Sequence, residues 1–159
     1  MKGMLERAGI EADATRKKHN VLERGFLCFP FSSGRKRMST IIENATGNGG
    51  YDKRLLCKGA SEMVKACCSH YLDAEGQRQE MNDAKNEELD GIIDRYADGA
   101  LRTIAVAYKD IQEGEFGENH DEPEEAEVKD IEKSGLTLVC IVGIMDIIRQ
   151  EVPAAVKKC

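Results

Sequence analysis

The segment that most constrains the fold is an almost unbroken apolar run at residues 136–145. A run of this length is too short to span a membrane as a helix. A continuous apolar stretch is typical of a strand that is covered on both faces, whereas a half-exposed strand alternates apolar and polar residues. The run therefore predicts a buried β-strand, around which other strands and helices must pack.

Other segments predict the neighbours of this strand. β-Branched and aromatic stretches bounded by turn residues predict strands at residues 21–31, 38–42, 51–57 and 101–108. Helical spacing of apolar residues predicts a helix from Ser61, whose hydroxyl can cap it, to about Leu72. Similar patterns predict a helix over residues 82–97 and the first turns of another at 151–158, with Pro153 early in it.

The charges are distributed unevenly along the 159 residues. The net charge is −6, and residues 113–132 hold ten acidic side chains against a single lysine, Lys129. Such a tract cannot bury enough apolar surface to pack, so it predicts a mobile acidic loop at residues 111–133. The rest of the chain is mildly basic, but the overall charge is negative and we expect no nucleic-acid partner.

The six cysteines predict reduced thiols and no metal site. Cys67 and Cys68 are adjacent, the chain contains no CxxC pair, and the three histidines are scattered. A cysteine-based redox protein requires an activated, exposed thiol, and only Cys57 has a neighbour, Lys58, that could activate it. We therefore rank a redox function well below the alternatives that follow.

A lysine and a glycine follow the predicted strand at residues 51–57. A strand that ends there delivers Lys58 to an open rim, and Gly59 has no Cβ, so a ligand can approach the backbone closely. The same two residues at a strand end more often form a plain turn. The pattern is therefore compatible with a binding site or with a turn.

Four sequence blocks occur in the order and rough spacing of the cytosolic nucleotide-binding (N) domain of P-type ATPases. They are PFSSGRKRMS at residues 30–39, KGASE at 58–62, LRTIA at 101–105 and VGIMDIIR at 142–149. The chain resembles this family from about residue 15 to its end. Within the family, the first three blocks are most similar to calcium pumps of the plasma-membrane type.

The resemblance implies a site for ATP. Phe31 matches the aromatic residue on which adenine stacks, and Lys36 and Lys58 match lysines that favour the triphosphate. Arg102 matches an arginine that reaches the phosphates, where a guanidinium can form two hydrogen bonds at once. The implied cofactor-binding residues are Phe31, Lys36, Lys58, Gly59, Ala60, Arg102 and Ile104, and no catalytic or metal-binding residue is implied.

Each of these residues also has a structural interpretation that does not depend on the family. Phenylalanine is mostly a core residue, so Phe31 by type alone belongs in the interior. The basic triplet at residues 35–37 is typical of a solvated turn, and Arg102 near the start of a strand is typical of a salt bridge at the sheet edge. These alternatives stay open at the level of sequence.

The resemblance also implies a fold class and a domain layout. The fold is α+β, an antiparallel β-sheet flanked by helices and truncated at its N-terminus, which leaves an unpaired edge that invites association with another chain. Residues 1–145 form part of the nucleotide-binding domain, and residues 146–159 form the hinge and the start of the phosphorylation domain. Asp146 and Arg149 match the hinge, but Ile147 and Gln150 replace the prolines that are usual in the family.

The implied function is delivery of ATP within a calcium-transporting P-type ATPase. The domain captures ATP and swings it about the hinge, so that the γ-phosphoryl group meets an aspartate outside this chain. The parent is then an ATP-hydrolysing enzyme that needs magnesium and calcium, and the partners of this domain are its phosphorylation and transmembrane domains. We expect the domain to lie on the cytosolic side of a membrane, to be soluble by itself and to hydrolyse nothing alone. The alternative is a non-enzymatic interaction module whose acidic loop docks a basic partner.

Overall fold

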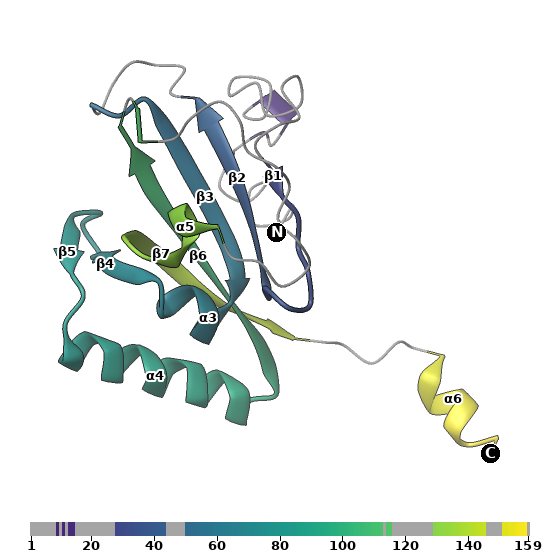
Figure 1. The fold of residues 1–159 in the computed structure, drawn as a ribbon. Helices are drawn as coiled ribbons and strands as arrows, with labels where there is room; N and C mark the ends of the chain where they lie inside the picture. The colour runs from purple at the N-terminus through teal and green to yellow at the C-terminus, as the bar shows by residue number, and fades with distance from the viewer. Residues whose placement is uncertain are drawn as a thin grey trace.

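The computed structural model describes residues 28–43, 50–112, 114–115, 129–145 and 151–158, together with residues 9, 11, 13 and 14. Within these residues, seven strands form one sheet in the order β1-β2-β3-β6-β7-β4-β5 (Figure 1). The strands are β1 (Cys28–Phe29), β2 (Arg37–Glu43), β3 (Lys53–Ala60), β4 (Cys68–Leu72), β5 (Arg78–Glu80), β6 (Leu101–Ile111) and β7 (Leu136–Met145). The helices are α3 (Ser61–Lys65), α4 (Asp83–Asp98), α5 (Asp130–Lys133) and α6 (Val152–Val156).

The apolar run at residues 136–145 forms β7, as predicted, and connects strands β1, β2, β3 and β6 to strands β4 and β5. It pairs antiparallel with β6 and parallel with β4, while the other described pairs are antiparallel. The α+β class is confirmed, and the single parallel pair is an addition to the antiparallel sheet that was expected. Beyond Leu138 the strand has only β6 as a described neighbour, and Val139, Ile144 and Met145 are exposed. The expected cover on both faces is therefore wrong for its second half.

One face of the sheet packs against α3 and α4 to form the core. Val64 of α3 and Leu89 of α4 are buried against apolar side chains of the central strands. The predicted helix over residues 82–97 is confirmed as α4, and the Asn82 side chain caps it by accepting the Lys85 N–H at 2.8 Å. The buried cluster comprises Phe29, Ile41, Leu55, Cys57, Val64, Cys67, Leu89, Ala105, Ala107, Ile111, Leu136 and Leu138.

The helix that was predicted from Ser61 to Leu72 is mostly wrong. α3 ends at Lys65, and the chain then turns into β4, which pairs with β7. Ser61 does not cap the helix, because Ala60 is the N-cap and Ser61 is buried in the first turn. Apart from Leu72, the residues of β4 are weak helix formers, so the strand pairing offered by β7 overrides the helical spacing.

The described end of the acidic tract is ordered, contrary to the mobile loop that was predicted there. Residues 130–133 form α5, and the Glu132 side chain is fully buried. Residues 116–128 of the tract lie outside the described residues, as do most of residues 1–27 and the hinge at 146–150.

α6 begins with a proline in its first turn, as predicted. No helix in the described ranges combines the length and apolar character needed to cross a membrane.

Candidate functional site

A cavity of about 740 Å³ opens where β2, β3 and β6 lie side by side. The seven residues that the resemblance implied all line it, so segments far apart in the sequence meet here. Ser33, Met38 and Thr103 also line the cavity and were not predicted. The full lining is Phe31, Ser33, Lys36, Met38, Lys58, Gly59, Ala60, Arg102, Thr103 and Ile104.

Strand alternation explains how the lining side chains reach the cavity. In β3 the Cys57 side chain is buried in the core and the next side chain, Lys58, is exposed, because successive residues point to opposite faces. Met38 of β2 is the direct partner of Lys58, and Ile104 of β6 is the direct partner of Ala60. β3 continues to Ala60, so Lys58 and Gly59 lie within the strand and not in a turn after it.

Phe31 lies in the segment that precedes β2, and its side chain is 63% exposed. Phe29, two residues earlier, is buried and occupies the core position. The interpretation of Phe31 as a core residue is therefore wrong. An exposed aromatic ring at the rim of an apolar hollow is available for stacking with a planar ligand.

The cavity is lined by three cations and no carboxylate. Within the described part of the chain, the side chains of Lys36, Lys58 and Arg102 have no hydrogen bond or ion pair. A salt bridge of Arg102 at the sheet edge is thus not found among the described residues. Three unpaired positive charges around a hollow attract an anionic ligand and raise its local concentration.

Gly59 is required by its neighbouring strand. A Cβ at this position would lie 2.7 Å from both Cα and Cβ of Arg37 and would collide with the Lys36 carbonyl oxygen. Lys36 has a left-handed backbone (φ 52°), and its carbonyl accepts the Ala60 N–H at 2.9 Å. The missing side chain thus accommodates the tight junction between β2 and β3, whereas the sequence had suggested a ligand approaching the backbone.

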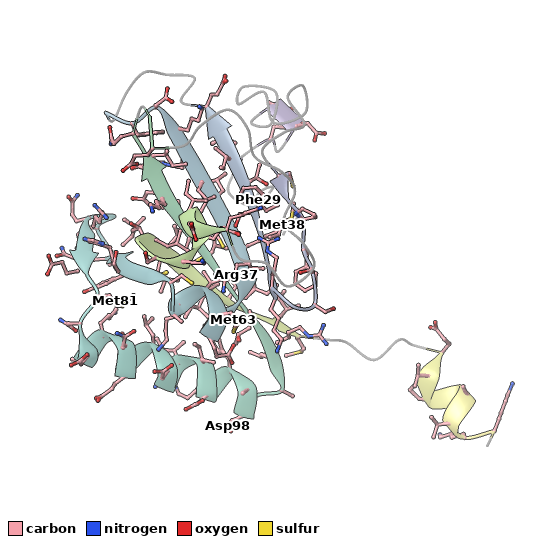
Figure 2. The ribbon with its side chains drawn as sticks, viewed as in Figure 1. Phe29, Arg37, Met38, Met63, Met81 and Asp98 are labelled. Carbon is pink, nitrogen blue, oxygen red and sulfur yellow. The ribbon has the colours of Figure 1, made fainter. Side chains whose placement is uncertain are left out.

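The basic triplet at residues 35–37 is not a solvated turn. Only Lys36 is exposed, whereas the side chains of Arg35 and Arg37 are buried. Arg37 lies beside α3 and donates to the Cys67 Sγ at 3.0 Å and to the Met63 carbonyl at 3.3 Å (Figure 2). Arg35, Arg37 and Ser39 are two residues apart, and this spacing indicates that their side chains share one face. Because all three are polar, the sequence does not indicate that this face is buried.

Three of the five described thiols are poorly suited to redox chemistry. Burial raises the pKa of Cys57, of Cys140 and of Cys68, the last to about 12. Cys57 faces the core and Lys58 faces the cavity, so the lysine that could have activated this thiol points away from it. The described residues also contain no group of three or more histidine, cysteine or acidic side chains that could hold a metal ion.

We expect Cys57 and Cys68 to resist alkylation in the folded chain. With a pKa of about 12, only roughly one Cys68 in ten thousand is a thiolate at pH 8. Pulsed iodoacetamide labelling at pH 8 followed by peptide mass mapping measures this, and the same pulse in urea is the control that exposes every thiol. Rapid native labelling of Cys57 would contradict the prediction and revive the redox interpretation.

Comparison with known proteins gives one consistent result. The family model for the cytoplasmic N domain of P-type ATPases matches residues 2–151. Calcium-transporting ATPase PAT1 of Dictyostelium discoideum is 36% identical over 95% of this chain, and the plasma membrane-type calcium-transporting ATPase 4 of Arabidopsis thaliana is 34% identical over 95%. Human plasma membrane calcium-transporting ATPase 1 is 37% identical over 82%. The chain spans only 12%, 13% and 10% of these three relatives, respectively.

Proposed function

Because the chain belongs to the family of cytoplasmic N domains of P-type ATPases, we propose that its cavity binds ATP and delivers it within a longer calcium-transporting ATPase. The observation that carries this proposal is the grouping of three unpaired cations around an apolar hollow, beside the exposed ring of Phe31. Adenine stacks on the ring and the triphosphate meets the cations. Relatives named calcium-transporting ATPases support the choice of parent.

The chemistry of each side chain indicates which part of the nucleotide it contacts. Arg102 offers a planar fork that can bind two phosphate oxygens, and Lys36 and Lys58 act as point charges that favour a tri- over a monophosphate. Ile104 and Met38 supply apolar surface near the base. The cavity of about 740 Å³ is within the size range of small-molecule sites.

The role that we propose for this domain is positioning. Catalysis of phosphoryl transfer depends mostly on placing the nucleotide and stabilising charge, and the acceptor aspartate of the parent lies outside this chain. The lining has no carboxylate to offer a magnesium ion, so its residues do not fit a resident metal. We propose that residues 146–159 connect this domain to the phosphorylation domain, on the cytosolic side of the membrane that the parent spans.

Titration of the isotope-labelled chain with ATP, ADP, AMP and adenosine tests the proposal. We expect the backbone amides of Phe31, Lys58 and Arg102 to shift, with affinity falling in the order ATP, ADP, AMP because fewer phosphate charges meet the cations. Added salt should weaken ATP binding and leave adenosine binding nearly unchanged. If the three amide signals stay still at millimolar ATP, the proposal is wrong.

Replacing Phe31 with alanine should weaken the binding of every adenine nucleotide. Stacking of a base on an aromatic ring contributes about 1 to 3 kcal/mol, which corresponds to an affinity loss of about 5- to 150-fold. The melting temperature should hardly change, because the Phe31 side chain is exposed. The control is Met63→Ala, which removes an exposed apolar side chain that does not line the cavity. Equal losses in both variants, measured by calorimetry, would argue against stacking.

A further inference from the structure

A buried ion pair lies behind the wall of the cavity, on the core side of the sheet. The Arg35 Nη2 donates to both carboxylate oxygens of Glu132, at 2.6 and 2.7 Å, and the two side chains are 1% and 0% exposed. The same carboxylate accepts the Ser39 hydroxyl and, at 3.3 Å, the Lys129 N–H at the start of α5. Glu132 therefore joins α5 to β2 and to the segment before it, across 97 residues of sequence.

The same arginine braces a segment that carries three of the ten residues lining the cavity. Its Nη1 donates to the Pro30 carbonyl at 2.6 Å, and its backbone N–H donates to the Ser32 hydroxyl at 3.2 Å. The Lys36 N–H closes the turn on the Ser32 carbonyl at 2.8 Å. The guanidinium thus links Pro30, at the start of residues 30–36, to Arg35 near their end, and these residues carry Phe31, Ser33 and Lys36 into the cavity.

We propose that Glu132 is a positioning residue for the nucleotide site. It acts through Arg35, because its carboxylate holds the guanidinium in the orientation that fixes residues 30–36 with Phe31 and Lys36 at the cavity. Glu132 does not itself line the cavity. This inference rests on the proposed function and adds to it a residue from the acidic tract, which the family resemblance did not assign to the site.

The energetics of a buried ion pair support this role. Removing one partner leaves the other as an uncompensated charge in the core, which is far more unfavourable than the loss of a surface pair. The Arg35 Nε already has no hydrogen-bond partner among the described residues, so the core offers this guanidinium little to replace Glu132. Without the carboxylate, Arg35 turns towards solvent and residues 30–36 move with it. The cavity then loses the placement of its aromatic ring and of one lysine.

The test compares four variants by amide chemical shifts without nucleotide and by ATP affinity. Glu132→Ala should move the signals of Phe31, Ser33 and Lys36, leave those of α4 and β5 in place, and weaken ATP binding by about tenfold or more. Glu132→Gln keeps one oxygen for Arg35 and Ser39 but not the charge, so it should restore both readouts only in part. Asp130→Asn is the matched control, because Asp130 is exposed on the same helix and its side chain bonds only Lys133 among the described residues. This control should resemble the wild type.

Arg35→Lys keeps the proposal testable if Glu132→Ala fails to fold. The lysine can still pair with Glu132, but a single ammonium cannot also brace the Pro30 carbonyl as the guanidinium does. We expect shifted signals at residues 31–36 and weaker ATP binding in a folded chain. Unchanged signals and unchanged affinity in this variant would overturn the proposal, as would a Glu132→Ala variant that is merely less stable. If the wild type itself does not bind ATP, the proposed function fails, while the shifts without nucleotide still decide the role of Glu132.

Discussion

Replacing Gly59 with valine is expected to lower the free energy of unfolding by about 3 kcal/mol, at the upper end of the usual effect of overpacking. The new Cβ would lie 2.7 Å from the Arg37 Cα, and the backbone has little freedom to yield because β3 is paired with β2 on one side and β6 on the other. Urea denaturation monitored by circular dichroism measures the change. Nucleotide binding should be lost together with the junction at Lys36.

The control is Gly91→Ala, because a Cβ at this position in α4 meets no other atom within 4 Å. Alanine is the better helix former by about 1 kcal/mol, so this variant should be slightly more stable than the wild type. The pair of variants also separates two explanations of Gly59. If Gly59→Val unfolds like the wild type and loses only ATP binding, the glycine serves the ligand, and the steric requirement of the strand junction is refuted.

Removing two of the three cations of the cavity, in the double variant Lys58→Ala/Arg102→Ala, should weaken ATP binding by about 100-fold. Each charge-assisted hydrogen bond to a phosphate is worth roughly tenfold in affinity, and both side chains have no described partner that would compete for them. Adenosine should bind as it does to the wild type, because it carries no phosphate. Calorimetric titration with both ligands measures the difference.

The matched control is Arg95→Ala/Lys157→Ala, which removes the same two charges from exposed positions outside the cavity lining. Its ATP affinity should stay close to that of the wild type. If the control loses as much ATP affinity as Lys58→Ala/Arg102→Ala, the affinity depends only on the overall charge of the chain. A loss of adenosine binding in the cavity variant would instead mean that the cavity had collapsed.

The sequence predicted which residues line the cavity, but it did not predict the buried residues behind the cavity wall. The seven implied residues come from three of the four family blocks and line one cavity, because these blocks lie on the adjacent strands β2, β3 and β6 or in the segment leading into β2. Their role in binding stays a prediction. The residues behind the wall were missed: Arg35 and Arg37 were assigned to a solvated turn, and Glu132 to a mobile loop. A charged side chain in a sequence is normally exposed, and only its partner makes burial possible.

The sequence by itself determined the elements whose local signals are strong. β7 is a continuous apolar run, and α4 has a capping asparagine and apolar residues at helical spacing, so both appear within one residue of the predicted bounds. Only the tertiary structure decided β4, the burial of Arg35 with Glu132, and the reason for Gly59. Each depends on a neighbour distant in sequence: β7 for β4, α5 for Arg35, and the left-handed Lys36 in the segment before β2 for Gly59. Local propensity cannot register such a contact, because its energy exists only after the chain has brought the two segments together.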